Sequence, residues 1–371
     1  MTYSLVRRPI QCPEAFARKD DRALQSQAAL LLLLGNQQPQ EVVRNLPDVS
    51  HQQFPIPHRL PRAARSSVER VRNTLTRRYG RWLFNQKTQI YQEKYSGVLL
   101  DLAERLYRNP KPLIAAELLE VSLRHPDSLV QVAAAASLLR TRGRSPSLIR
   151  VLIEGIDNPD ELVRQLAAMA LAVIESDHPS VRRLLKRKAS DAARHNPSHT
   201  STLVHGTFAR QSTWWQPGGD FHTYLLNSVR SDLYSASDRF DWSGGYSDRA
   251  RADGARKLVA WAEARNLDGL DLFTHSHGGS VAMLASHKGL SVRTLVLLSC
   301  PVHPAKYLPN FSSISRAVSI RVQMDLVILL DQGGQLFQHP QIEEHILPIW
   351  FQHSATHSPD VWKKHVASGW T

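Results

Sequence analysis

The chain has 371 residues, more than one ordinary domain holds, and 42% of them are hydrophobic, so we expect two or three folded units. Its two cysteines, Cys12 and Cys300, exclude a disulfide framework and indicate either a reducing compartment or a protein that is indifferent to redox conditions. The net charge of +13 is uneven: residues 196–371 hold 15 Lys and Arg against 14 Asp and Glu, whereas the rest holds 31 against 19.

Residues 1–94 are predicted to form a basic, partly helical segment. The apolar run at 30–34 is far shorter than the roughly 20 residues that span a bilayer, and no signal-peptide cleavage site follows it, so we expect a buried helix there and a cytoplasmic protein. Arginines and a partial apolar stripe at 59–81 are compatible with an amphipathic basic helix, and the general rule that charge runs lie at the surface favours a solvated arginine-rich face packed on the next domain. The alternative is a helix that binds a polyphosphate or an anionic membrane surface, which would make the protein membrane-peripheral, and nucleic acid is the least favoured partner.

Residues 95–195 contain a weak internal repeat. The segment that follows Pro126 recurs after Pro159, 33 residues later, with an acidic residue and then an Ala, Leu and Val stripe in both copies. We expect these prolines at the first helical position, followed by helices that pack closely on their neighbours. This pattern resembles HEAT-type helical repeats, and an irregular helical bundle is the alternative.

Residues 196–371 alternate between apolar strand-like runs and helical stretches. The pattern predicts a mostly parallel six-stranded sheet with helices on both faces. A helix is expected from about 247 to 265. The expected strands lie at 201–205, 239–242, 270–275, 294–299, part of 318–330, and 346–351.

One of these strands leads into a turn with a serine at its tip. The run 270–273 is apolar, Ser276 follows within the turn, and helical spacing begins after Gly279. A nucleophile elbow of the G-x-S-x-G type needs this order, with small residues such as Gly278 under the strained serine. Thr274 stands where the first glycine is usual. From these residues the domain 196–371 resembles the α/β-hydrolase superfamily, in particular its lipase and esterase-like members.

This resemblance implies two main-chain donors for an oxyanion. One is the N–H of His277, directly after the serine, and the other is the N–H of Thr207, in the His-Gly loop that ends an earlier strand, where Gly206 allows close approach. The substrate pocket is expected to include His205, Phe208, Trp242 and His275.

The resemblance also implies an acid and then a histidine after the serine in the chain. Asp325 stands where the acid is expected, with Asp331 as the alternative. His353 and His357 both follow the last predicted strand, and either could be the base.

We therefore predict a serine hydrolase that cleaves carboxylic esters, with a small-molecule ester or lipid-like substrate. About eighteen residues separate the strand that ends at Ser299 from the next one, too few for a helical lid. No Cys or Glu completes a tetrahedral zinc set with the paired histidines, so no metal or cofactor is expected. The alternative function is a helical-repeat interaction protein with a catalytically idle hydrolase domain.

Overall fold

The computed structural model describes residues 15, 20–45, 89–186, 200–234, 239–365 and 367–371 of the chain. They belong to two compact units, Met1–Ile174 and Glu175–Thr371. The boundary lies earlier than the predicted one after residue 195, because α10 (Pro179–Leu185) belongs to the second unit. Side chains of Arg210 and Gln211 donate to main-chain carbonyls at the end of α10. The predicted basic helix at 59–81 lies outside the described residues.

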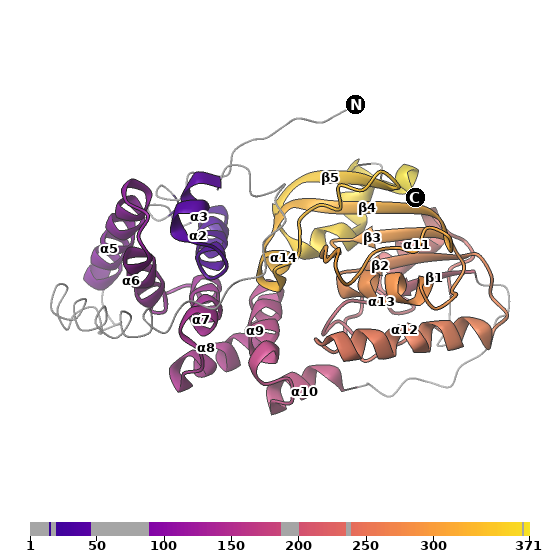
Figure 1. Ribbon diagram of the computed structural model, residues 1–371, viewed down its shortest axis with the longest axis horizontal. Coiled ribbons are helices and arrows are strands. Elements are labelled where there is room, and N and C mark those ends of the chain that lie inside the picture. Colours follow the sequence, from indigo (N-terminus) through magenta and orange to yellow (C-terminus); the bar gives the residue numbers. More distant parts are fainter. Residues whose placement is uncertain (1–14, 16–19, 46–88, 187–199, 235–238, 366) are drawn as a thin grey trace. The chain divides into compact units, whose positions relative to one another are not determined.

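The described part of the first unit consists of helices and their connections (Figure 1). Asp20 caps α2 by accepting from the N–H of Ala23 at 2.7 Å. Residues 30–34 are all buried, which confirms the predicted buried helix. Where α2 packs on α7, Ser137 Oγ donates to the carbonyl of Leu31 at 2.7 Å. The helices are α2 (Asp21–Leu34), α3 (Pro39–Asn45), α5 (Gln89–Arg108), α6 (Pro112–Ser122), α7 (Ser128–Arg142), α8 (Pro146–Ile156) and α9 (Glu161–Ile174).

The sequence repeat has the same local structure in both of its copies. Asp127 Oδ1 accepts from two N–H groups in the first turn of α7, at 2.9 and 3.4 Å. Asp160 Oδ1 does the same in the first turn of α9, at 2.7 and 3.2 Å. Two residues before each aspartate, the side chain of His125 or Asn158 accepts from the N–H of that aspartate, at 3.0 and 2.9 Å. The two helices therefore start through matching hydrogen bonds.

The position of the prolines in this repeat differs from our expectation. Pro126 and Pro159 each lie before the capping aspartate, not at the first helical position. The reason is that Asp127 and Asp160 each satisfy two of the N–H groups that the first turn of a helix leaves without an intrahelical partner. The capping carboxylate therefore sets where each helix begins.

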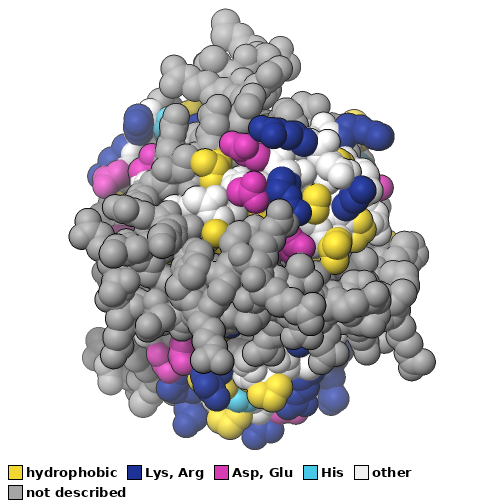
Figure 2. Space-filling view, turned by 90° about the vertical axis from the view of Figure 1, so that its left-hand side faces the viewer, with side chains coloured by type: hydrophobic (Ala, Val, Ile, Leu, Met, Phe, Trp, Pro, Cys, Tyr) yellow, Lys and Arg dark blue, Asp and Glu magenta, His cyan; other side chains and the backbone are white. Residues whose placement is uncertain are grey.

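The first unit exposes few large apolar side chains among its described residues. Leu113 is 48% exposed and Val173 is 56% exposed. Figure 2 shows one face of the molecule, and the hydrophobic side chains of described residues that are visible there lie singly or in small groups between charged ones. The helices of this unit therefore bury most of their apolar residues against one another. Across the described chain, every helix is too short or too polar to cross a membrane.

The second unit is built around one sheet of five parallel strands in the order β1-β2-β3-β4-β5 (Figure 1). Its carboxyl ends lie along one edge, because all strands run in the same direction. Sequence neighbours are also neighbours in the sheet, so each connection crosses to the adjacent strand. The strands are β1 (Ser201–Val204), β2 (Leu270–His275), β3 (Val292–Leu298), β4 (Ile314–Asp325) and β5 (Ile342–Phe351).

Of the six predicted strands, the one at 239–242 is not a strand in the structure. Phe240 and Trp242 are buried, which explains why the segment looks strand-like in the sequence. Side-chain contacts hold it in place: the indole N–H of Trp242 donates to the carbonyl of His205 at 2.8 Å. The alternating apolar residues Phe240 and Trp242 are buried on one side of a loop, and this segment does not pair with a strand.

Each face of the sheet carries its own apolar core. On β2, Leu272 belongs to one core and Phe273 to the other, as expected when successive side chains of a strand point to opposite faces. Side chains from α12 and α13 complete the first core, and side chains from α11 and α15 complete the second. Residues 299–313 contain no helix, which confirms that no helical lid lies between β3 and β4. The helices are α11 (Asp220–Ser228), α12 (Asp248–Glu263), α13 (His277–Ser286), α14 (Leu326–Asp331) and α15 (Pro359–His365).

Candidate active site

Ser276 lies at the sharp turn between β2 and α13. Its backbone has φ 52° and ψ −132°, a conformation that residues with a side chain rarely adopt. Its N–H donates to the carbonyl of Leu298 on β3 at 2.8 Å, which fixes the turn to the neighbouring strand. This is the strand-turn-helix geometry, with a strained serine at the tip, that the sequence predicted.

The loop after β1 lies directly against this turn. A Cβ added to Gly206 would stand 2.8 Å from Ser276 Cβ, and one added to Gly278 would stand 2.7 Å from the carbonyl oxygen of His205. Neither position has room for a side chain, so the two glycines allow the β1 loop to approach the elbow. Thr207, the predicted oxyanion donor, follows in this loop and is 3% exposed.

Asp325 and His353 form a buried pair at the ends of β4 and β5. His353 Nδ1 lies 2.7 Å from Asp325 Oδ2, and both side chains are at most 2% exposed. Asp325 is held in turn, because its Oδ1 accepts from two N–H groups at the start of α14 and its own N–H donates to Gln335 Oε1 at 2.9 Å. His353 Nε2 is buried and has no hydrogen-bond partner among the described residues. This nitrogen is therefore not engaged by another polar group of the described chain.

His275 connects this pair to the elbow. It directly precedes Ser276, its ring lies 4.6 Å from the ring of His353, and its Nε2 lies 3.4 Å from the carbonyl oxygen of His353. Burial and the neighbouring imidazoles hold the pKa of His275 well below its usual value. The structure thus brings the predicted serine, acid and one predicted histidine to the carboxyl edge of the same sheet.

His357, the alternative base, has different surroundings. Its ring stacks on Trp214 at 4.2 Å and meets His275 edge-on at 4.6 Å. Burial lowers the pKa of His357 to about 3, and the charge of a protonated His353 adds to that effect. In the described part of the chain no carboxylate contacts its ring, so the geometry favours His353 over His357 as the base.

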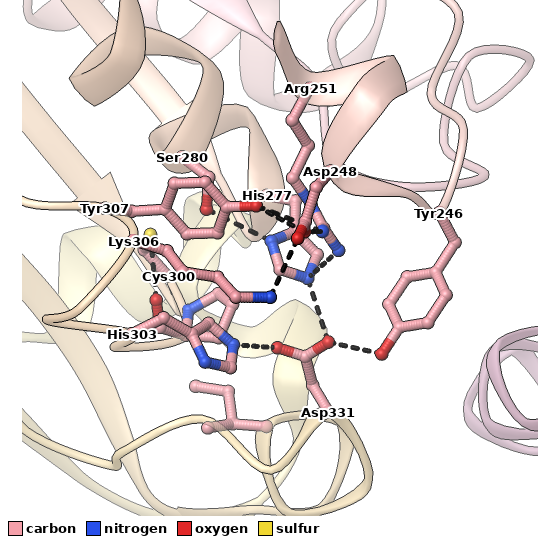
Figure 3. A network of polar contacts seen from close by, with 12 residues as sticks. Tyr246, Asp248, Arg251, His277, Ser280, Cys300, His303, Lys306, Tyr307 and Asp331 are labelled. Carbon is pink, nitrogen blue, oxygen red and sulfur yellow. Dashed lines mark hydrogen bonds and ion pairs between the residues drawn. The ribbon is translucent and has the colours of Figure 1, made fainter. Parts of the chain in front are cut away.

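Asp331, the alternative acid, does not contact His353. Its Oδ1 lies 3.0 Å from His277 Nε2 and accepts from the Tyr246 hydroxyl at 2.5 Å, and its Oδ2 lies 2.6 Å from His303 Nε2 (Figure 3). Burial alone would raise the pKa of Asp331, but the charges and hydrogen bonds of the two histidines outweigh it and hold the pKa well below its usual value. Asp331 is therefore the centre of a second polar cluster.

His277 joins this second cluster to the elbow. Its Nδ1 lies 3.1 Å from Ser280 Oγ, and its Nε2 lies 2.8 Å from a guanidinium nitrogen of Arg251. Burial is the main reason that the pKa of His277 falls to about 4, so the ring is neutral at neutral pH. The main-chain N–H of His277 is the first of α13, where a helix offers no intrahelical acceptor.

The predicted pocket residues differ in exposure. The ring of His205 packs on those of Trp215 and Trp242, with centroid distances of 4.5 and 5.7 Å, and its Nε2 is 3.5 Å from Asp241 Oδ1. Because His205 and Trp242 are both 0% exposed, they support the β1 loop from within the core and do not form the surface of a pocket. Phe208 is partly exposed, with φ 58°, and remains available to a substrate.

Sequence reasoning missed several residues that hold the site. Gln335 binds both main-chain groups of Asp325, and Tyr246 and His303 bind Asp331. These residues lie in loops without a recognisable motif, so only the fold reveals them. No group of His, Cys, Asp and Glu within the described residues could hold a metal ion.

Comparisons with known proteins add little to this geometry. No family model matches the chain, and no curated protein is significantly similar to it. Among solved structures the chain is similar to an uncharacterized protein from Bacillus cereus ATCC 10987, with 14% identity, 73% of this chain and 97% of that chain covered, and a TM-score of 0.28. A likeness of this size does not bear on the fold or the function.

Proposed function

We propose that the second unit is a serine hydrolase of the α/β-hydrolase type, which cleaves carboxylic esters with Ser276, His353 and Asp325. The observation that carries this proposal is a strained serine at a strand-to-helix turn, adjacent to a buried aspartate–histidine pair on the same sheet edge. The order serine, acid, histidine along the chain is the one used by α/β hydrolases.

The hydrogen bond from His353 to Asp325 assigns the proton on the imidazole. Nδ1–H donates to the carboxylate, so Nε2 carries the lone pair that accepts the proton of Ser276 as its hydroxyl attacks the acyl carbon. Asp325 then stabilises the imidazolium. His353 returns the proton to the leaving alcohol, and water releases the acyl group from Ser276 in a second step.

Two main-chain donors would bind the oxyanion of the tetrahedral intermediate. The N–H of His277 is one, as the first donor of α13. The N–H of Phe208 is already engaged with the carbonyl of Gly244 at 3.0 Å, so the β1 loop offers the N–H of Thr207 as the other. Gly206 supports this assignment, because a Cβ there would stand 2.8 Å from Ser276 Cβ, so only a glycine lets the loop approach the serine this closely.

The substrate is proposed to be an ester with an apolar or lipid-like acyl group. Trp214 and His357 stack at 4.2 Å, and their rings lie 5.5 and 4.6 Å from the ring of His275. Phe221 is fully buried and packs behind this pair. Rates with p-nitrophenyl esters of increasing acyl length test this, and a preference for acetate over every longer chain would contradict it.

A fluorophosphonate probe tests the hydrolase itself. We expect covalent labelling of the full chain and loss of labelling in Ser276→Ala. Hydrolysis of p-nitrophenyl esters should be lost both in Ser276→Ala and in the wild-type chain after labelling. A chain that folds but neither reacts with the probe nor hydrolyses any ester would overturn the proposal.

The second candidate is an interaction protein in which HEAT-like helical repeats bind a partner and the hydrolase domain is idle. The matching helix starts at Asp127 and Asp160 favour repeats in the first unit. Absence of fluorophosphonate labelling in a folded chain would favour this candidate, whereas Ser276-dependent turnover would exclude an idle domain.

A further inference from the structure

A buried carboxylate lies behind the residue that would bind the oxyanion. Asp331, at the end of α14, is 3% exposed in its side chain and contacts His277, His303 and Tyr246 (Figure 3). These partners come from three separate parts of the second unit: the start of α13, the loop after β3, and the segment before α12. One carboxylate therefore ties three segments to the elbow.

The ring of His277 is held on both of its edges. Its Nε2 lies 2.8 Å from Arg251 and 3.0 Å from Asp331, whereas Nδ1 lies 3.1 Å from Ser280 Oγ. A neutral imidazole has one donor and one acceptor nitrogen. If Nε2 accepts from Arg251, Nδ1–H donates to Ser280; if Nε2–H donates to Asp331, Nδ1 accepts from the hydroxyl of Ser280. The ring has partners at both nitrogens in either tautomer.

Arg251 and Asp331 also depend on each other. Arg251 is 5% exposed, and the charge of Asp331 counters the burial penalty on its guanidinium, so the pKa of Arg251 stays above its usual value. Removing the carboxylate charge would leave a buried cation against His277 with less compensation. The position of the ring would then change, and the main chain of His277 would change with it.

We propose that Asp331 is a positioning residue: through the imidazole of His277 it fixes the N–H that binds the oxyanion beside Ser276. This inference rests on the proposed function. It separates the roles of the two aspartates that follow the elbow, because Asp325 orients the base and Asp331 orients the oxyanion donor. The carboxylate does not touch the reacting atoms.

The test compares Asp331→Asn with Asp248→Asn in the full chain. Asp248 is the control for the charge of this network, because it is a carboxylate that binds Arg251, Lys306 and Tyr307 but does not contact His277. Its side chain is 57% exposed, whereas that of Asp331 is 3% exposed. For Asp331→Asn we expect kcat and the rate of fluorophosphonate labelling to fall by about 10- to 100-fold, since a misplaced donor loses part of the roughly 10²- to 10³-fold effect of one oxyanion hydrogen bond. KM is expected to stay within about threefold, because the oxyanion forms only after substrate binding.

Tyr246→Phe is the second variant and keeps the test usable if Asp331→Asn does not fold. It removes one donor to Asp331 but keeps the ring that packs on Arg251. We expect a smaller fall in kcat, about three- to tenfold, again without a change in KM. The final labelling stoichiometry should equal that of the wild type, because every molecule retains its site and only the rate changes.

The outcomes separate this inference from the proposed function. Wild-type rates in both Asp331→Asn and Tyr246→Phe, or a loss that Asp248→Asn shares in full, would overturn the positioning role while leaving the hydrolase in place. A fall in labelling stoichiometry at an unchanged rate would show that Asp331 only supports folding, which also overturns it. A wild-type chain that the probe does not label would overturn the hydrolase and this role together.

Discussion

The two ring nitrogens of His353 have different surroundings, and the proposed mechanism assigns each a separate role. Nδ1 is 2.7 Å from Asp325, while Nε2 is buried without a partner among the described residues. We expect Asp325→Asn to lower kcat for p-nitrophenyl esters by about 10⁴-fold, because an amide no longer selects the tautomer that leaves Nε2 basic. Steady-state kinetics measure this loss, and a variant that retains a tenth of wild-type kcat would contradict the assignment.

The neighbouring histidines provide a paired test of the base. His353→Phe should abolish ester hydrolysis, whereas His357→Phe should keep kcat within about threefold, because an aromatic ring preserves the packing on Trp214 and His357 has no acid partner. Equal losses of kcat in the two variants, measured on samples that unfold at similar urea concentrations, would contradict the assignment of His353 as the base.

At the scale of residues, the sequence predicts the position of the serine but does not decide which aspartate and which histidine accompany it. A strand followed by Ser276 and a small-residue turn is a local pattern, so the elbow could be found without the fold. The choice between Asp325 and Asp331, and between His353 and His357, could not, because each pair lies within a few residues of the same strand end. Only the tertiary contacts distinguish them: Asp325 lies against His353, whereas Asp331 lies against His277.

At the scale of elements, two helix glycines have opposite roles. A Cβ on Gly155 of α8 would stand 2.7 Å from Val132 on α7 and 2.8 Å from Ala167 on α9, whereas a Cβ on Gly97 of α5 would meet nothing within 4 Å. Gly155→Ala should therefore lower the free energy of unfolding by about 1–3 kcal/mol through overpacking. Gly97→Ala should raise it by up to about 1 kcal/mol through helix propensity. Urea unfolding followed by far-UV circular dichroism tests both, and stabilisation by Gly155→Ala would contradict close packing of α8.

The elements themselves were predicted where the sequence pattern is local and missed where a tertiary contact decides. Apolar runs predicted β1 to β5, and the helix at 247–265 agrees with α12. The segment at 239–242 has the same alternation but is held by Trp242 against the β1 loop. Pro126 was likewise expected at the first position of a helix, but the capping hydrogen bonds of Asp127 set where that helix begins.

At the scale of the whole molecule, strain gathers along one edge of the sheet. Ser276, Ser299, Met324 and Phe351 all have φ between 45° and 68°, and they lie at the carboxyl ends of β2, β3, β4 and β5. Non-glycine residues in such conformations persist only where the surrounding structure holds them. The four unfavourable backbone conformations therefore lower the stability of the fold at this edge, as expected if the candidate active site lies there.

Acid sensitivity of the second unit follows from its buried neutral histidines. The pKa of His357 is lowered to about 3 and that of His277 to about 4, both chiefly by burial, against an unfolded value of 6.5. Between these values the unfolded chain binds protons that the folded chain does not, so the free energy of unfolding falls as pH falls below 6.5. Each such histidine contributes a slope of up to about 1.4 kcal/mol per pH unit.

His357→Phe isolates one of these contributions. Between about pH 6 and 4.5 the variant should lose less stability than the wild type, by about one proton or 1.4 kcal/mol per pH unit, because phenylalanine keeps the packing but cannot titrate. Urea unfolding followed by tryptophan fluorescence reports this, since seven of the eight tryptophans belong to the second unit. The aspartates whose pKa is lowered, Asp331 among them, have an unfolded pKa of 3.8 and titrate mainly below this window. Glu343, with an unfolded pKa of 4.5, is present in both proteins, so its contribution cancels in the comparison. Identical slopes for the two proteins would mean that His357 is already protonated in the folded state, and its stacking on Trp214 would then have to be reinterpreted.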